Sequence, residues 1–358
     1  MKLLVIHPGA STSTSDVADG LYLGLEQHGV DLVRYRLDQR IDRSHRWLHY
    51  NWRRTKKKHP DMQRPTTADI FFQAGADALV MALWHNVDCV LVVSAMFLHP
   101  DVLVMMKRAG LRVVVIFTES PYDLEKELAV AKIVDGCWTN ERTSLESFAA
   151  VNPRSGYLPH GWHPERHQPG PQDGDDAMLA HDVVFVGTGF HERIAWLSSI
   201  CWDGIDLGLY GNWQMLGSRH PLRRFVRDGT VDNAKVASLY RRAKIGLNLY
   251  RTSKGWGKQA PAISVAESLN PRAYELARCG VFSLSTARAE VTDVFGDLVP
   301  TFSSAREASD LIRRWLADPE GRARVQAQLP GRVAQASWSH RAKQVLGDLQ
   351  SLLQSRAA

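Results

Sequence analysis

Short apolar runs alternate with amphipathic stretches of helical length along most of the chain. Strands are predicted at residues 2–7, 31–35, 89–93, 113–117, 136–139, 182–186, 206–210, 245–249, 281–284 and 298–302. Helices are predicted at residues 15–28, 69–86, 100–109, 122–133, 143–149, 192–201, 231–242, 271–279, 305–317 and 332–353. This alternation is typical of βαβ units, whose strands lie in a parallel sheet. The pattern restarts near residue 180, which predicts two doubly wound α/β domains.

Length and composition agree with two domains. The 358 residues, 44% of them hydrophobic, can bury two ordinary cores. We expect a first domain at residues 1–165, an exposed Pro-, Gly- and Asp-rich linker at 168–176 and a second domain at 177–336. The sequence has no run of eighteen apolar residues, which argues against a membrane span. The first apolar run, residues 2–7, is too short for a signal peptide. The 4 cysteines lack C-x-x-C spacing, as is typical of free thiols in a reducing cytoplasm.

Positive charge is concentrated in residues 34–64, which hold eleven Lys or Arg against three Asp. Four aromatic residues stand among these charges: Tyr35, Trp47, Tyr50 and Trp52. Basic side chains with stacking rings attract phosphate backbones and splayed bases. The alternative is a solvated insertion, or packing of Arg stems on the domain's own rings. We interpret residues 38–65 as a long basic insertion, without a clean amphipathic helix, whose candidate contacts to a polyanionic acceptor are Arg53, Arg54, Lys56 and Lys57.

The segment from Glu267 to Thr286 is the most informative part of the second half. Asn270 can cap a helix, and Pro271 fits its first turn because proline's missing N–H would have no partner there. The start of such a helix offers free N–H groups and a positive dipole end to an anion, to which Arg272 adds a fixed charge. Glu275, about one turn further on, can accept hydrogen bonds from a pair of sugar or ribose hydroxyls. A nucleotide-sugar fits this order of groups.

The same segment carries a resemblance to a known family. Glu267 and Glu275 form an E-x7-E pair, similar to that of many GT-B glycosyltransferases that retain anomeric configuration. The fuller string L-N-P-R-x-x-E-x-x-x-C-G at residues 269–280 resembles the CgeB-type, spore-maturation branch. The likeness extends to residues 184–193, 207–213 and 243–249, and to 158–164, which resemble the segment joining the two domains of that fold. It covers the chain from about residue 135 onward.

The resemblance implies a GT-B fold, in which two Rossmann-like domains face each other across a cleft. It also implies that a terminal helix at about residues 337–355 packs back on the first domain. Glu275 would bind the donor ribose, Glu267 would act on the sugar hydroxyls as a catalytic residue, and Arg272 with Asn270 would hold the phosphates. Such enzymes use no cofactor beyond the nucleotide-sugar, here expected to be a UDP-sugar. They stabilise the leaving diphosphate with cationic groups and a helix dipole in place of a metal.

Further candidates lie in the loops that follow strands, where doubly wound domains bind ligands. Gly187 and Gly189 would let backbone N–H groups approach a diphosphate that Arg193 neutralises. The glycine-rich, cationic stretch 251–258 could cover a donor phosphate, for which Arg251 and Lys254 are the candidates, or it could steer an acidic acceptor. Tyr210 could stack on the base, although an aromatic residue after a strand is as often part of the core.

On the acceptor side, residues 8–15 form a small, polar loop in which Gly9 and Ser11 could approach a substrate. An ordinary strand–helix loop capped by Ser15 explains it equally well. Glu119 follows a strand and could take a proton from an acceptor hydroxyl, or it could cap the helix that begins at Pro121. His160 could point into the cleft. The spacing of His160, His163 and His167 resembles a metal site only on a regular helix, which the neighbouring prolines and glycine exclude.

The sequence therefore predicts a metal-independent glycosyltransferase of hexosyl type that transfers sugar to an acceptor hydroxyl, for instance on a hydroxymethylated base in DNA. A base in duplex DNA would have to be flipped out to react. Transfer to a polysaccharide, a lipid carrier or a protein is the alternative within the same enzyme class. A non-catalytic module that binds nucleotide-sugar or nucleic acid, and a two-domain epimerase, also remain open.

Overall fold

The first half of the chain forms one parallel sheet. The structure is a computed structural model that describes residues 1–9, 14–172, 179–228, 231–254, 261–263 and 265–354. The sheet has six strands in the order β2-β1-β3-β4-β5-β6, and each neighbouring pair is parallel. The strands are β1 (Lys2–His7), β2 (Asp31–Arg36), β3 (Cys89–Val93), β4 (Val113–Ile116), β5 (Gly136–Thr139) and β6 (Ser155–Tyr157). The predicted parallel α/β architecture is confirmed here.

A second parallel sheet follows. Its six strands have the order β12-β11-β10-β7-β8-β9, again with parallel neighbours. They are β7 (His181–Val186), β8 (Leu207–Tyr210), β9 (Val226–Asp228), β10 (Ala243–Asn248), β11 (Ser283–Thr286) and β12 (Thr301–Phe302). Strand β10 lies between β7 and β11, so the loops that follow these three strands open at the same edge of the sheet.

The chain divides into two compact units. Unit 1 consists of Met1–Pro159 together with the residues from Arg341 onward, and unit 2 consists of His160–His340. Residues 160–165, which the sequence assigns to the first domain, thus belong to unit 2. Their attachment is visible at Trp162, whose indole N–H donates to the carbonyl of Val333 at 2.7 Å.

Helix α3 of unit 1 begins where the sequence supplies a cap. At the start of α3, Thr66 Oγ1 accepts a hydrogen bond from the Asp69 N–H at 3.2 Å, and the Asp69 carboxylate accepts one from the Thr66 N–H at 2.8 Å. This reciprocal pair is a capping box. The helices are α1 (Ser15–Gln27), α2 (Leu37–Thr55), α3 (Thr67–Trp84), α4 (Pro100–Arg108), α5 (Leu124–Ala131), α6 (Leu145–Val151) and the terminal α14 (Trp338–Gln354).

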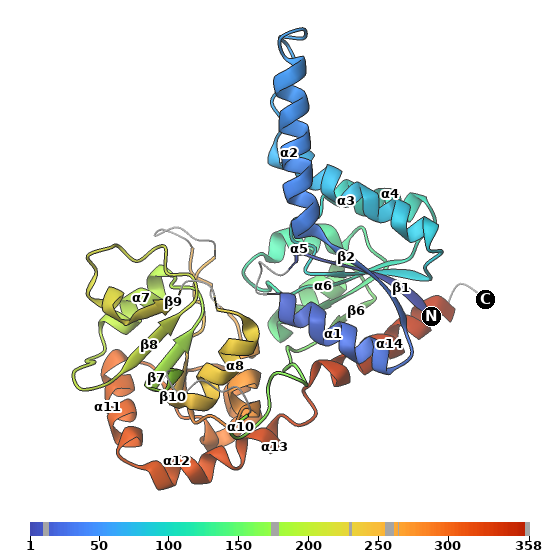
Figure 1. Cartoon of the computed structure of the whole chain (residues 1–358). Helices are drawn as coiled ribbons and strands as arrows, with labels where there is room; N and C mark the ends of the chain where they lie inside the picture. Colours follow the sequence, from blue (N-terminus) through green and yellow to red (C-terminus); the bar gives the residue numbers. More distant parts are fainter. Residues whose placement is uncertain (10–13, 173–178, 229–230, 255–260, 264, 355–358) are drawn as a thin grey trace. The chain divides into compact units, whose positions relative to one another are not determined.

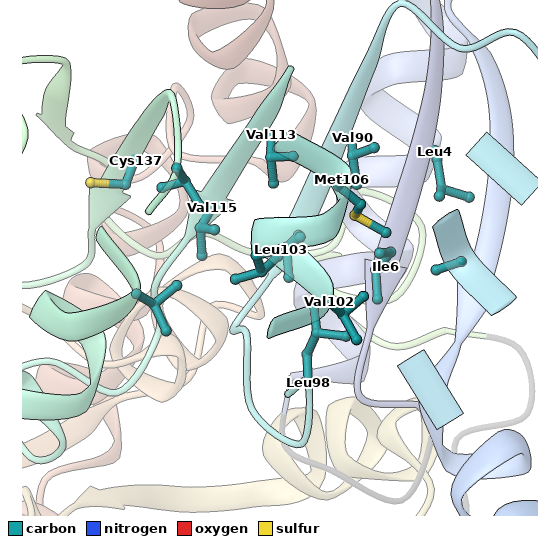
Figure 2. Packing of buried hydrophobic residues seen from close by; sticks show 14 of the residues in the cluster. Leu4, Ile6, Val90, Leu98, Val102, Leu103, Met106, Val113, Val115 and Cys137 are labelled. Atoms are coloured by element: carbon teal, nitrogen blue, oxygen red, sulfur yellow. The ribbon is translucent and has the colours of Figure 1, made fainter. Parts of the chain in front are cut away.

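The core of unit 1 is built from strand residues that are apolar on both faces. Figure 2 shows strand side chains packed with side chains of α4, among them Ile6, Val90 and Val115 beside Leu103 and Met106. All of these side chains are fully buried. Continuous apolar runs are typical of central parallel strands, which are covered on both sides. The terminal helix belongs to the same unit from Arg341 onward, and its Asp348 accepts a hydrogen bond of 2.8 Å from the Trp138 indole.

Helix α2 corrects a prediction. The sequence indicates an insertion without a clean amphipathic helix at residues 38–65, but residues 37–55 form a helix of 19 residues. Its inner stripe is short: Leu37 is buried, Ile41 and Leu48 are half-buried, and the polar Ser44 lies between them. The helix packs against α3 and extends away from the sheet of its unit (Figure 1). Because this inner stripe holds only three apolar residues and a serine, the sequence pattern did not predict the helix.

Unit 2 contains seven α-helices among its described residues. They are α7 (His191–Ser198), α8 (Asn233–Arg242), α9 (Pro271–Arg278), α10 (Ala289–Phe295), α11 (Ala305–Leu316), α12 (Pro319–Gln326) and α13 (Leu329–Arg332). The sequence predicts α7, α8, α9 and α11 within a few residues. Within the described ranges of both units, the helices are too short or too polar for any one of them to cross a lipid bilayer.

Candidate functional site

The start of helix α9 has the cap that its sequence predicts. Asn270 is the N-cap, its side-chain oxygen accepts a hydrogen bond from the Ala273 N–H at 3.1 Å, and Pro271 occupies the first turn. The Asn270 side-chain N–H donates in turn to Asn248 Oδ1 at 2.8 Å. Asn248 is the last residue of β10 and is 2% exposed. The helix start is therefore fixed to the end of the neighbouring strand.

Arg272 converges on the same asparagine. Its Nη1 donates to Asn248 Oδ1 at 3.1 Å and its Nε donates to the carbonyl of Val186 at 2.7 Å. The guanidinium carbon lies 4.6 Å from the centre of the Phe185 ring. These contacts hold the guanidinium between the ends of β7 and β10. An arginine has five N–H groups, so these two bonds leave it able to donate to an anion as well.

Gly187 allows this position of Arg272. Its φ is +152°, and a Cβ added there would lie 2.3 Å from Arg272 Nη2. Two residues on, a Cβ at Gly189 would lie 2.3 Å from the Trp213 ring. Space that the sequence assigns to a diphosphate is thus used in part by the protein's own side chains. The Gly187 N–H donates to the Tyr210 carbonyl at 2.9 Å and the Gly189 N–H donates to the Asn212 carbonyl at 2.8 Å, so these two N–H groups are not free to hold the diphosphate as the sequence predicts.

Glu275 lies one turn into α9, next to Tyr240 of α8. The Tyr240 hydroxyl donates to Glu275 Oε2 at 3.4 Å. Burial raises the pKa of Glu275 to about 7, although the positive charge of Arg272 and the hydrogen bond from Tyr240 act in the opposite direction. The carboxyl group is therefore able both to donate and to accept hydrogen bonds near neutral pH, which suits a site for hydroxyl groups.

Glu267 lies before α9 rather than on it. The carboxylate of Glu290, which is 7% exposed, accepts a hydrogen bond of 2.5 Å from the Leu269 N–H, and the Glu290 N–H donates to the Glu267 carbonyl at 3.1 Å. These two bonds fasten the loop that carries Glu267 to the start of α10. The two glutamates of the E-x7-E pair thus belong to one loop–helix segment. The catalytic role of Glu267 stays a prediction.

Arg193, the first of the predicted phosphate-binding cations, is held by backbone carbonyls. It is 7% exposed, and it donates to the carbonyl of Leu249 from Nε and to that of Thr188 from Nη1, both at 3.0 Å. It therefore joins the loop after β7 to the end of β10. Its positive charge lies in the loop region where we expect a diphosphate, and the two carbonyls fix the guanidinium there.

Arg251 and Lys254 follow β10 in the sequence. The Arg251 guanidinium lies 4.6 Å from the centre of the Phe190 ring. The backbone carbonyl of Arg251 accepts a hydrogen bond of 3.0 Å from Arg288 Nη2. The Lys254 N–H donates to the carbonyl of Pro261 at 2.8 Å. Residues 255–260, which complete the predicted cationic loop, lie outside the described residues.

Tyr210 corrects a prediction of base stacking. The side chain is 3% exposed and belongs to a core cluster with Val184 and Tyr240. Its hydroxyl lies 2.8 Å from His181 Nε2, and His181 Nδ1 lies 2.7 Å from an Asp206 carboxylate oxygen. A ring covered in this way has no free face for a base. Trp213 is equally buried, so the structure favours the core interpretation of this motif.

In unit 1, Glu119 lies on a braced loop after β4. The Glu119 N–H donates to Glu127 Oε1 at 3.1 Å, and the Ser120 hydroxyl donates to Glu127 Oε2. Asn140 exchanges two hydrogen bonds of 3.1 Å with the Ser120 backbone. Helix α5 begins only at Leu124 with Asp123 as its N-cap, so neither Glu119 nor Ser120 caps a helix starting at Pro121. The half-buried Glu119 remains a candidate base.

The other acceptor-side candidates are spread over unit 1 and the start of unit 2. Gly9 has a φ of +112°, and a Cβ there would lie 2.0 Å from Asp38 Cγ, so the loop packs tightly on the start of α2. Ser11 lies outside the described residues. His160 belongs to unit 2, is 5% exposed and contacts the Trp338 ring edge-on.

The basic candidates lie at the distal end of α2. Arg53, Arg54, Lys56 and Lys57 are exposed. Of the interleaved aromatics, Trp47 and Tyr50 are 55% and 56% exposed, whereas Tyr35 is fully buried and donates to the Ala74 carbonyl at 2.6 Å. Tyr35 thus belongs to the packing of its own domain, and contact of the exposed rings with a polyanion stays a prediction.

The sequence analysis did not assign a donor-site role to three residues that the structure places there. Asn248 joins Asn270 to Arg272, Tyr240 contacts Glu275, and His167 is a buried neighbour of Glu275. Asn248 gave a usable signal, because it is a polar residue at the end of an apolar strand, where α/β folds place ligand contacts. The other two depend on packing between segments far apart in sequence.

Comparisons with known proteins bear on the fold and on the family of the second half of the chain. Residues 193–347 match a family model described as glycosyl transferase-like. Similar solved structures include an α,α-trehalose 6-phosphate synthase from Burkholderia multivorans, with a TM-score of 0.61, 11% identity and coverage of 100% of both chains. Another is a structure from E. coli bound with UDP-2-fluoro glucose, with a TM-score of 0.60, 10% identity and coverage of 99% of both chains.

A chain from Listeria monocytogenes described as a UDP-N-acetylglucosamine 2-epimerase is similar to the same degree. It has a TM-score of 0.61 and 13% identity, over 99% of this chain and 97% of that one. A comparison with curated proteins found no sequence match. Identities this low show the fold alone. With the two parallel six-stranded sheets, they establish a GT-B fold that carries a glycosyltransferase-like domain.

Proposed function

We propose that this chain is a glycosyltransferase that moves a sugar from a nucleoside diphosphate donor to an acceptor hydroxyl. The observation that carries the proposal is the fixed start of helix α9, where Asn270 and Arg272 both donate to Asn248 beside the loop of Gly187. A helix start with a preoriented guanidinium suits the two charges of a diphosphate. The family match over residues 193–347 supports the same assignment.

Three residues would bind the donor along one segment. Arg272 and the positive end of the α9 dipole would hold the phosphates. Glu275 would bind the ribose hydroxyls. This residue is half-buried, and burial raises the pKa of its carboxyl group to about 7, so the group can both donate and accept hydrogen bonds near neutral pH. Glu267 would contact the hydroxyls of the transferred sugar. This order places a nucleotide-sugar along the loop and first turns of α9.

The departing diphosphate would be stabilised by cationic groups and the helix dipole, without a metal. Arg193 contributes its charge from a buried position against Phe185 and Phe190. Arg251, against Phe190, and Lys254 would add to the positive potential, which is effective because low-dielectric surroundings screen it poorly. The donor we favour is a UDP-hexose.

Unit 1 would supply the acceptor side. Glu119, on the loop braced by Glu127 and Asn140, would take the proton from the acceptor hydroxyl. The exposed arginines and rings of α2 favour a polyanionic acceptor, and we propose DNA carrying a hydroxymethylated base. Flipping the base out of the duplex would expose its hydroxyl to the reaction.

A thermal-shift screen with UDP-glucose, GDP-mannose, ADP-glucose and dTDP-glucose tests the donor assignment. A ligand that binds only the folded state adds about 2.7 kcal/mol to its stability at a hundred times Kd. We expect one donor to raise Tm in the wild type and much less in Arg272→Lys, because lysine cannot reproduce the forked contacts. Arg306→Lys, at an exposed position on α11, is the matched control. A screen without any stabilising donor would count against the proposal.

Donor turnover then separates the remaining possibilities. A transferase hydrolyses its donor slowly without acceptor and transfers sugar when DNA with hydroxymethylated bases is added. An epimerase, the activity named for the Listeria monocytogenes chain, converts the sugar to its epimer without transferring it to an acceptor. A binding module leaves the donor intact. Liquid chromatography of donor, free sugar and labelled DNA distinguishes all three outcomes.

A further inference from the structure

His167 is locked in one orientation at the start of unit 2. Its backbone N–H donates to the carbonyl of His163 at 3.0 Å, and its ring Nδ1 accepts the His163 N–H at 2.9 Å. A neutral imidazole whose Nδ1 accepts a hydrogen bond carries its proton on Nε2. The geometry therefore makes Nε2 a hydrogen-bond donor.

This donor has no acceptor among the described residues. His167 Nε2 is buried and forms no hydrogen bond with them, and the whole side chain is only 1% exposed. Burial lowers the pKa of His167 to about 3, and the charges of Arg166 and Arg241 act in the same direction. The ring stays neutral over the physiological range. A buried N–H without a partner is costly, so a ligand that satisfies it is favoured.

Glu275 offers an acceptor nearby in the same unit. A ring nitrogen of His167 and a carboxylate oxygen of Glu275 lie within 4.8 Å of each other, without a direct hydrogen bond. Two hydrogen bonds of about 2.8 Å that meet at a tetrahedral oxygen span about 4.5 Å. One hydroxyl oxygen could therefore accept from His167 and donate to Glu275.

We propose that His167 and Glu275 together bind one ribose hydroxyl of the donor nucleotide, which makes His167 a specificity-determining residue for ribonucleotides over deoxyribonucleotides. The inference rests on the proposed function, because it assumes that the nucleotide lies along α9. A buried polar pair that binds a hydroxyl rejects the analogue that lacks it, since both partners are then left unsatisfied. A bound water in place of the hydroxyl would give no such selectivity.

Two substitutions separate the role of Nε2 from that of Nδ1. In His167→Asn, the side-chain oxygen can replace Nδ1 as acceptor of the His163 N–H, and the variant has no donor at the place of Nε2. In His167→Gln, the longer amide can place an N–H near the position of Nε2. His163→Asn is the control, because the side-chain oxygen can replace the His163 Nδ1 that accepts the Glu165 N–H at 3.2 Å.

The test measures binding of UDP, GDP and ADP, each with its 2′-deoxy and 3′-deoxy analogue, by isothermal titration calorimetry. We expect the wild type to bind its best ribonucleotide about tenfold or more tightly than one of the two deoxy analogues. His167→Asn should lose that preference by weakening the ribonucleotide alone, and His167→Gln should restore part of it. His163→Asn should retain it.

The outcomes distinguish this inference from the proposed function. Binding of a ribonucleotide with a preference that His167→Asn leaves unchanged would overturn the role of His167 and leave the donor site standing. Equal weakening of ribo- and deoxyribonucleotides in His167→Asn, with unfolding midpoints matched to the wild type, would also overturn it. If no nucleoside diphosphate binds the wild type, both the proposed function and this inference fail.

Discussion

Arg272 donates a hydrogen bond of 3.1 Å to the side-chain oxygen of Asn248, a residue 24 positions away in sequence at the end of β10. The same oxygen accepts the N–H of Asn270 at 2.8 Å. One amide thus orients both the helix cap and the cation that we assign to the diphosphate. The positions of Asn270 and Arg272 therefore depend on the side chain of Asn248, which has no direct role in the proposed chemistry.

Replacement of Asn248 should weaken donor binding without removing any group proposed to touch the donor. Asn248→Ala leaves Asn270 and Arg272 without their acceptor, which should cost about 1–3 kcal/mol of stability. Asn248→Asp keeps an acceptor for both donors and should cost less. Chemical denaturation and calorimetric binding of the identified donor would check both effects. Equal behaviour of the two variants would contradict the orienting role of Asn248.

Gly187→Ala should displace Arg272. The new Cβ would lie 2.3 Å from Arg272 Nη2, and a φ of +152° is unfavourable for alanine. We expect a loss of about 1–3 kcal/mol in folding free energy, together with weaker donor binding. Gly217→Ala is the matched control, because nothing lies within 4 Å of a Cβ there. A Gly187→Ala variant that binds donor with unchanged affinity would show that Arg272 is not needed in its present position.

Sequence patterns predicted the central elements of both sheets well. Strands β1, β3 and β5 have the predicted bounds. In β1 and β3 a continuous apolar run matches a central parallel strand that is covered on both faces. The cap at Asn270 was also predicted, since a cap is determined by residues three positions apart. Sequence patterns are sufficient to predict an element where the interactions that determine it lie between residues close in sequence.

The elements and residues that sequence patterns missed have the opposite cause. Strands β6 and β9 have 3 residues each and lie at sheet edges. Their formation depends on pairing with the neighbouring strand rather than on their own sequence. Tyr210 ends strand β8 and Trp213 follows it, in a pattern compatible with either a ligand contact or the core, and only packing excludes stacking on a base. His167 lies near Glu275 although much of unit 2 separates the two residues in sequence. No spacing rule could predict that proximity.

Stability should fall as pH rises through the range set by Glu127. Burial raises the pKa of this carboxyl group to about 7 from an unperturbed 4.5, with smaller contributions from the charges of Glu119 and Asp123. Between these pH values the folded state holds a proton that the unfolded state has released. The free energy of unfolding therefore decreases with rising pH, by at most about 3 kcal/mol.

Glu127→Gln should remove this dependence, because an amide does not titrate. The Tm of the variant relative to the wild type should rise between pH 5 and pH 8. Glu125→Gln, at an exposed position on the same helix, should leave the profile unchanged. Differential scanning calorimetry across that range gives the answer. A constant Tm difference between Glu127→Gln and wild type would mean that Glu127 is already ionised at pH 5.

The distal end of α2 should contribute most of any affinity for DNA. Arg53, Arg54, Lys56 and Lys57 are exposed there, with Trp47 and Tyr50 on the same helix. Changing the four cations to glutamine should weaken binding, and should reduce the slope of log K against log salt by about 0.9 for each phosphate that these side chains no longer neutralise. Fluorescence anisotropy with labelled duplex and single-stranded DNA at several salt concentrations measures both quantities.

A variant with Arg306, Arg314, Arg324 and Arg332 changed to glutamine removes the same charge from exposed positions of unit 2. Unchanged DNA binding and transfer in the α2 variant would reject DNA as the acceptor, and retained binding to anionic vesicles by the wild type alone would indicate a lipid surface instead.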